Sequence, residues 1–432
     1  MNRKGTSAFV AAAGLLMFAG SVLASGGTYS ASRQVILDWN QVAQANIGGQ
    51  PFSQTRSYAM VHIAMADAVI AIEGNYDPFH ASLKNVPHGA SAGAAAAQAA
   101  HDVLVALIPA NQAVFDTALA ESLSNIPPGQ RMNGTKVGKK VAEKVLAWRQ
   151  NDGFATANPQ PPAFLPSTLP GIWRQTASGA AQYSELGSVD PFGLLTPTQF
   201  LPAAPPQLES DEWATDYNEV REKGRKTGST RTVDEDRFAQ LIANAPGPYA
   251  NVTNPFRLWN NIATEVANNE RLSLVRTARL FALMTASIHD SLQTSHTSKF
   301  VYRLWRPENA IAAADTDDNP DTSPEAGWVP LLTTPPYPSH SSNMSCIGSG
   351  AAQMLANVFG TDSKSFTARW FAADGSLVYA IPYNSFWALG ADEGSSRIWG
   401  GLHYRFEITA SEQSCAQVAN YIYDHYMQRN KH

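Results

Sequence analysis

Residues able to hold a tetrahedral oxyanion are concentrated in three short segments in the last third of the chain. Residues 299–307 read KFVYRLWRP, residues 337–340 read YPSH, and residues 396–403 read SRIWGGLH. Fixed cations offset the charge of an oxyanion, a hydroxyl group donates to one of its oxygens, and an imidazole attacks or ligates its central atom. The segments supply this set in Lys299, Arg306, Ser339, His340, Arg397 and His403.

The spacing within the first and third segments indicates how these side chains could face one pocket. Lys299 and Arg306 are seven residues apart, which on a helix is about two turns and predicts that both lie on one face. Pro307 is expected to end or kink that helix. Glu407 follows His403 by four residues, so on a helix it could accept a hydrogen bond from the second ring nitrogen and fix the tautomer.

The second segment precedes a predicted helix. Its Pro-rich approach is followed by a Ser-rich start, which offers helix caps, free backbone N–H groups and the positive end of the helix dipole. Each segment alone also fits an ordinary structure: a solvated basic face that includes Arg303, a capped helix with His340 on the surface, or a core histidine beside an acid. A shared anion site explains all three segments at once.

The three segments resemble a signature shared by vanadium-dependent haloperoxidases and type 2 phosphatidic acid phosphatase-like acid phosphatases. That signature reads Lys-x6-Arg-Pro, then Pro-Ser-Gly-His, then Ser-Arg-x5-His, and the first and third blocks match fully. Flanking residues are similar to the bacterial haloperoxidase branch, namely Ala59-Met60-Val61-His62 with Asp67, Trp305 before Arg306-Pro307, and Gly400-Gly401 before His403. The resemblance covers most of the chain and implies an all-α fold, with helical bundles around an oxyanion pocket.

The resemblance also implies a role for each site residue. His403 would ligate vanadate in a peroxidase, or form a phosphohistidine in a phosphatase. Ser339 would hydrogen-bond one oxygen of the oxyanion, and His340 would be the acid–base partner. The oxyanion would be vanadate or phosphate, which share charge and tetrahedral shape. The cations that would neutralise it are Lys299, Arg306 and Arg397, with Glu407 and Trp305 supporting them from behind.

The middle block departs from the signature, because its Gly is missing and Ser339 runs directly into His340. We take His340 as the acid–base residue. In a shifted register, Ser342-Asn343-Met344 would stand against Ser-Gly-His and would replace the acid–base histidine with Met344. The distance to the small-residue run at 348–352 gives that register some support.

Three functions remain open. The first is a vanadate-dependent haloperoxidase that oxidises halide with hydrogen peroxide, which the chain length of 432 residues favours because phosphatases of this signature are usually much shorter. The second is an acid phosphatase that cleaves phosphomonoesters through His403. The third is a non-catalytic oxyanion-binding protein, which the irregular middle block suggests. The formal net charge of −5 and the lack of basic runs argue against a nucleic-acid partner.

Helical periodicity dominates the elements that must position these residues, and long alternating strand patterns are absent from the sequence. We place a soft boundary near residue 210. Residues 25–210 would form an N-terminal helical part with a Pro-rich segment at 158–206, and residues 211–432 a C-terminal helical part that carries the site. The predicted helices span residues 57–72, 91–108, 132–149, 211–224, 233–244, 272–294, 342–359 and 410–429.

The N-terminus predicts export. Asn2-Arg3-Lys4 precedes an apolar stretch that ends at Ala24, so residues 1–24 are typical of a cleaved signal peptide, and the mature protein would be periplasmic or secreted without a membrane span. Cys346 and Cys415 are the only cysteines, so they form either one disulfide or two buried thiols. The oligomeric state cannot be read from these residues.

Overall fold

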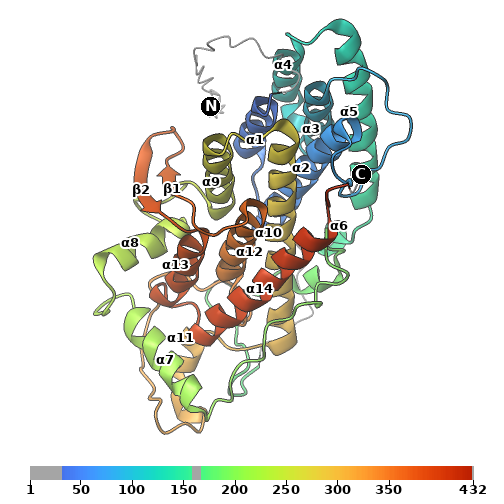
Figure 1. Cartoon of the computed structure of the whole chain (residues 1–432). Helices are drawn as coiled ribbons and strands as arrows, with labels where there is room; N and C mark the ends of the chain where they lie inside the picture. Colours follow the sequence, from blue (N-terminus) through green and yellow to red (C-terminus); the bar gives the residue numbers. More distant parts are fainter. Residues whose placement is uncertain (1–31, 158–166, 431–432) are drawn as a thin grey trace, which may run out of the picture.

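The computed structural model describes residues 32–157 and 167–430. The all-α prediction is confirmed, because helices dominate these residues and one two-stranded hairpin accompanies them (Figure 1). The predicted signal peptide, residues 1–24, lies outside the described residues, as do residues 158–166 of the Pro-rich segment. None of the helices in the described part is long and apolar enough to cross a bilayer.

The N-terminal helices gather at one end of the molecule (Figure 1). They are α1 (Gln34–Asn46), α2 (Pro51–Glu73), α3 (Ala92–Leu107), α4 (Gln112–Leu123), α5 (Pro128–Arg149) and the short α6 (Phe154–Ala157). Glycines let α5 approach α3 closely, since a Cβ at Gly138 would lie 2.3 Å from the carbonyl oxygen of Ala95. The side chain of Ser91 caps α3 by accepting from the N–H of Ala94.

The C-terminal helices surround the site. They are α7 (Asp211–Lys223), α8 (Val233–Ile242), α9 (Pro255–Asn269), α10 (Leu274–Tyr302), α11 (Pro307–Ala312), α12 (Asn343–Phe359), α13 (Phe386–Trp399) and α14 (Arg405–His425). Strands β1 (Phe366–Phe371) and β2 (Leu377–Tyr383) form the antiparallel hairpin between α12 and α13, in which Phe366 pairs with Tyr383. Periodicity did not predict α1, α4, α9, α13 or the hairpin.

Helix α10 is the central element, and it packs against α2, α12 and α14 (Figure 1). Nearly every side chain from Leu274 to Lys299 is buried, although the last turns are polar. Two glycines bring α12 close to its neighbours: a Cβ at Gly350 would lie 2.5 Å from the hydroxyl of Ser291 on α10, and one at Gly348 would lie 2.5 Å from Oε2 of Glu393 on α13. The start of α12 is thereby held between α10 and the end of α13.

A disulfide joins Cys346 on α12 to Cys415 on α14, so of the two alternatives for the cysteines the structure has the bridge. The described part of the Pro-rich segment packs against the same helices. Asp290 on α10 accepts hydrogen bonds from the N–H groups of Phe192, Gly193 and Leu194 at 2.7–3.0 Å. Backbone groups of this segment therefore fix it to the central helix, and it forms a wall rather than a free connector.

The contact between α12 and α13 predicts a pH-dependent stability. Glu393 is fully buried, accepts a hydrogen bond from Nε1 of Trp259 at 3.1 Å, and has its pKa raised to about 8 by burial. The folded protein keeps this proton at pH values at which the unfolded chain has lost it. The resulting stabilisation is complete below about pH 4.5 and is lost as the pH rises through about 8.

A Glu393→Gln variant should lack this dependence, because the amide is neutral at every pH. We expect the free energy of unfolding of the wild type to fall relative to that of the variant between pH 5 and pH 8, by up to about 1.4 kcal/mol per pH unit. Urea unfolding at several pH values measures this difference. Glu265→Gln, at a partly exposed glutamate paired with Arg369, is the control and should keep the wild-type slope. Parallel curves for wild type and Glu393→Gln would contradict the prediction.

Candidate active site

Lys299 lies in the last turn of α10 and is fully buried. Its ammonium group donates to the carbonyl oxygen of Ser339 at 2.8 Å and to that of Ser341. Burial, and secondarily the charge of Arg306, lowers the pKa of Lys299 well below its usual value. Lys299 therefore links residues 339–341 to α10 through hydrogen bonds to backbone oxygens, and it places a cation behind the site.

Arg306 reaches the site differently from the sequence prediction. The helix that carries Lys299 ends at Tyr302, Arg303 has a φ of 59°, and Arg306 is the N-cap of α11, so the predicted shared helical face is wrong. A left-handed residue reverses the chain here and brings the guanidinium back. Its Nε donates to the carbonyl oxygen of Tyr337 and its Nη1 to that of Leu402, both at 3.0 Å, whereas the buried Nη2 has no partner among the described residues.

His403 is held between Arg306 and Glu407 in the loop that joins α13 to α14. Its Nδ1 lies 2.9 Å from Oε2 of Glu407, the contact that the four-residue spacing predicts, and its Nε2 lies 3.1 Å from Nη1 of Arg306. A guanidinium can only donate, so Nε2 is the acceptor and Nδ1 carries the proton. Burial, then the charge of Arg306, lowers the pKa of His403 well below its usual value. A lone pair on Nε2 is thus kept among cations.

Glu407 is the carboxylate that faces this cluster. Its Oε2 accepts hydrogen bonds from His403, from the hydroxyl of Ser339 and from the N–H of Tyr404, each at 2.9 Å. Burial raises the pKa of Glu407 to about 7, and the charge of Lys299 opposes that rise. Glu407, together with Glu308 near Arg306, stands against three buried cations, which leaves the site with excess positive charge.

Arg397 lies in the last turn of α13, three residues before the Gly400-Gly401 pair that leads to His403. A Cβ at Gly400 would lie 2.5 Å from the side chain of Leu332, so only glycine lets this turn pack so closely. The Nε atom of Arg397 is buried without a partner among the described residues, and burial lowers the pKa of Arg397 to about 10. This cation is available to a bound group.

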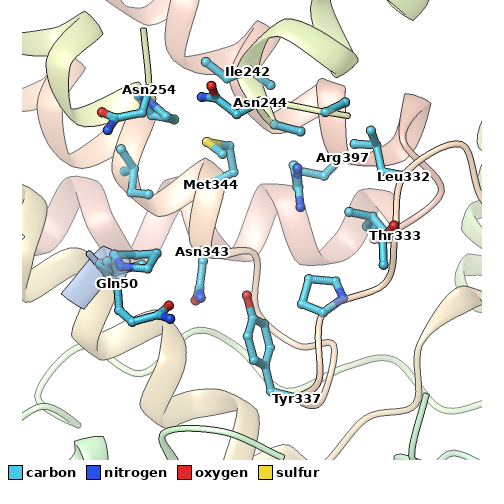
Figure 2. Close-up of a pocket in the computed structure, with 18 of the residues that line it drawn as sticks. Gln50, Ile242, Asn244, Asn254, Leu332, Thr333, Tyr337, Asn343, Met344 and Arg397 are labelled. Atoms are coloured by element: carbon cyan, nitrogen blue, oxygen red, sulfur yellow. The ribbon is translucent and has the colours of Figure 1, made fainter. Parts of the chain in front are cut away.

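A cavity of about 750 Å³ opens at Arg397 and His403 (Figure 2). Amide side chains recur on its wall, and no Asp or Glu belongs to the described residues that line it. The amide residues are Gln50, Gln54, Gln182, Gln240, Asn244, Asn254 and Asn343. Apolar residues fill much of the remaining wall, including Phe52, Phe256, Leu292, Leu332 and Ile347. The cavity suits an anionic group at its base and a larger neutral body above it.

The predicted roles of Ser339 and His340 conflict with their positions. The hydroxyl of Ser339 donates to Glu407 and not toward the cavity. Nε2 of His340 lies 2.8 Å from the carbonyl oxygen of Ala203, its ring packs against Tyr302 and Phe406, and burial lowers its pKa to about 4. Neither residue is on the cavity wall. The His340 imidazole therefore stands beside the site, with Nδ1 3.9 Å from Oε1 of Glu407, but it does not reach the cavity wall where the preferred register needs it.

The shifted register, in which Met344 takes the position of the signature histidine, agrees better with the residues found at the cavity. Ser342 caps α12 by accepting from the N–H of Ser345, and the next two residues, Asn343 and Met344, both line the cavity. In Figure 2 the thioether of Met344 and the guanidinium of Arg397 both reach into the cavity. Met344 has no proton to transfer, and among the described residues that line the cavity His403 is the one imidazole.

Trp305 and Tyr337 are two further residues at the site. Trp305 is buried behind it, with its ring 6.2 Å from that of Trp213, and packs the chain between α10 and α11. Tyr337, which the sequence analysis did not select, lines the cavity with its ring 5.5 Å from Nζ of Lys299 and 5.2 Å from Cζ of Arg306. The signal that could have identified it is an aromatic residue between two prolines, directly before Ser339.

The donor set fits a tetrahedral oxyanion such as vanadate or phosphate. Lys299, Arg306 and Arg397 provide three buried cations, and the last two carry buried N–H groups that lack partners within the described chain. Unpaired buried donors are costly, so native proteins usually satisfy them with a ligand or water. His403 adds the lone pair of Nε2, the atom that could ligate or attack the central atom.

Replacing Arg397 with Met should separate stability from binding. An unpaired buried cation costs free energy, so we expect Arg397→Met to be more stable than the wild type without oxyanion, by on the order of 1–4 kcal/mol. Its affinity for phosphate should fall about tenfold or more, because charge-assisted hydrogen bonds are lost. Urea unfolding and calorimetric titration with phosphate measure the two effects.

Arg405→Met is the matched control, since Arg405 is partly exposed and pairs with Glu219 at 2.6 Å. It should lose at most about 1 kcal/mol of stability and keep the affinity for phosphate. A less stable Arg397→Met protein, or one that binds phosphate like the wild type, would show that Arg397 serves the fold and not the anion.

Comparisons with known proteins match the part of the chain that carries this site. Residues 279–432 match the family model of the VCPO second helical-bundle domain, and this range includes Lys299, Arg306, Arg397, His403 and Glu407. No curated protein matches the chain. The fold is similar to that of a bacterial vanadium-dependent iodoperoxidase, with a TM-score of 0.75, 22% identity, and coverage of 92% of this chain and 96% of that one.

Two structures of bacterial vanadium-dependent chloroperoxidase are also similar. The apo-type structure has a TM-score of 0.70 at 14% identity and covers 90% of this chain and 97% of its own. The holo-type structure has a TM-score of 0.68 at 14% identity, with 89% and 97% covered. The match over residues 279–432 and the shared fold agree with the predicted resemblance: the C-terminal part of this chain matches a VCPO second helical-bundle domain, and the chain has a fold like that of the vanadium haloperoxidases.

Proposed function

We propose that the protein is a vanadate-dependent peroxidase that oxidises halide with hydrogen peroxide. The observation that carries the proposal is His403, whose Nδ1 proton is directed to Glu407 and whose Nε2 lone pair faces Arg306 at 3.1 Å. This tautomer suits a ring that ligates an oxyanion through Nε2 once the anion replaces His403 as the acceptor of the Arg306 hydrogen bond. The likeness in fold to iodoperoxidase and chloroperoxidase structures supports the same choice.

Each of these residues would have a separate role in the reaction. Lys299, Arg306 and Arg397 would balance the charge of vanadate, while Glu407 would keep the imidazole in one tautomer. Bound vanadate would supply the means to transfer an oxygen atom from hydrogen peroxide to halide. Overall, one halide ion, one hydrogen peroxide and one proton give one hypohalous acid and one water. The cavity would admit these reactants from the side of Arg397.

A phosphomonoesterase is the second candidate. The cavity volume of about 750 Å³ exceeds what halide and peroxide need and leaves room for an organic phosphate. Nε2 of His403 would then attack phosphorus and form the phosphohistidine. A non-catalytic oxyanion-binding protein is the third candidate, and the observation that favours it is Met344, which places a thioether where the signature has an acid–base histidine.

We also propose that the protein is exported, to the periplasm or beyond the cell. The Cys346–Cys415 bridge supports this, because disulfides persist in oxidising compartments. The basic and apolar start of the sequence supports it independently.

Paired assays on the purified protein test the proposed function. We expect added orthovanadate to activate peroxide-dependent bromide oxidation and to leave hydrolysis of an aryl phosphate negligible. His403→Ala should abolish the bromide oxidation while the fold remains intact by circular dichroism. Hydrolysis without vanadate, inhibited when vanadate is added, would establish the phosphatase instead. Binding of vanadate with neither activity would establish the third candidate.

The two registers of the middle block make different predictions for the same assay. Because His340 lies outside the cavity, His340→Gln should lower turnover less than threefold, whereas acid–base loss would cost about 10²–10⁴-fold. Met344→His would place an imidazole on the cavity wall, and we expect it to raise turnover. A large loss in His340→Gln, with vanadate affinity unchanged, would favour the original register.

A further inference from the structure

The hydroxyl of Tyr337 points into the cavity between Asn343 and Arg397 (Figure 2). Within the described chain no hydrogen-bond partner is found for it, although the rest of the residue is firmly held. The backbone carbonyl of Tyr337 accepts from Nε of Arg306 at 3.0 Å, and the residue stands between Pro336 and Pro338. A rigid side chain thus presents an unused donor to the base of the cavity.

Cations surround this ring. Nζ of Lys299 lies 5.5 Å from its centroid and Cζ of Arg306 lies 5.2 Å from it, while the edge of His296 packs at 4.9 Å. The hydroxyl is also close enough to Arg397 for the two to interact electrostatically. Any anion held by the three cations is therefore beside the phenol.

The other groups expected to donate cannot do so from their present positions. The hydroxyl of Ser339 is engaged by Glu407, His340 is turned toward the carbonyl of Ala203, and Met344 has no donor. Tyr183, the other phenol on the wall, packs against Phe52 at 4.9 Å, and none of the three site cations makes a ring contact with it.

We propose that Tyr337 is a catalytic residue, which donates a hydrogen bond to the bound oxyanion and its proton to the oxygen that leaves as water. This inference rests on the proposed peroxidase function. The phenol O–H bond breaks, the proton joins the departing oxygen, and solvent in the cavity returns a proton to the phenolate. Tyr337 thereby takes over the role that the resemblance gave to an imidazole.

Tyr337→Phe tests this assignment, because it removes only the hydroxyl. Calorimetric titration with orthovanadate should show affinity about tenfold weaker, the effect of one hydrogen bond to a charged group. At saturating orthovanadate, the kcat for bromide oxidation should fall by about 10²–10⁴, with the KM for bromide nearly unchanged. Tyr183→Phe, the matched control, should change affinity and kcat by less than about threefold.

A second variant distinguishes proton transfer from a structural role. Adding Met344→His to Tyr337→Phe supplies an imidazole on the cavity wall, so the double variant should regain at least about tenfold of the lost kcat. Wild-type kcat and vanadate affinity in Tyr337→Phe, alongside an inactive His403→Ala, would overturn the assignment while leaving the peroxidase function in place. If the wild-type protein oxidises no halide, the peroxidase function fails, and with it the proton transfer. The titrations would then still decide whether the hydroxyl binds the oxyanion.

Discussion

The accumulation of three buried cations around one imidazole is the constraint on which the rest of the structure depends. Lys299, Arg306 and Arg397 are removed from water, and among the described residues the carboxylates that act on them are Glu407, on Lys299 and Arg306, and Glu308, on Arg306. Like charges in a poorly solvating interior repel one another and lose hydration, so the arrangement is unfavourable by itself. It becomes favourable when an anion enters. The fold must therefore hold these side chains in place with interactions that do not neutralise them.

Backbone carbonyl groups provide those interactions. Lys299 donates to the carbonyls of Ser339 and Ser341, and Arg306 to those of Tyr337 and Leu402. Carbonyl dipoles fix the direction of a donor yet leave its net charge intact, unlike a carboxylate. Close packing of α12 against α10 and α13, through Gly350 and Gly348, keeps the participating segments in register. The bridge between Cys346 and Cys415 adds a covalent link between α12 and α14 directly behind the site.

The sequence predicted which charged residues form the site better than it predicted the backbone structure that brings them together. The helical character and most long helices follow from periodicity, and His403 with Glu407 follows from a four-residue spacing within one element. The helical face assigned to Lys299 and Arg306 was wrong because Arg303 adopts a left-handed conformation, which no propensity of arginine indicates. Partners that depend on tertiary contacts, such as the carbonyl of Ala203 that engages His340, have no local signature. Helix α13 was missed because its buried face is interrupted by Glu393 and Arg397, whereas α9 was missed although its apolar face, from Phe256 to Val266, is regular.

The backbone contacts also explain why the middle segment can differ from the signature while the flanking blocks match it. Lys299 and Arg306 bind main-chain oxygens of residues 337, 339 and 341, and a carbonyl group is present whatever side chain the residue carries. Substitutions there leave the anchoring of the cations intact, whereas replacing a cation or His403 would remove charge or the lone pair outright. Under the proposed function, anion binding and proton transfer would depend on separate parts of the site: the first on the matching blocks, the second on the side chains of the middle segment. In this chain the middle segment presents the side chain of Met344 at the cavity wall and that of Tyr337 among the cations.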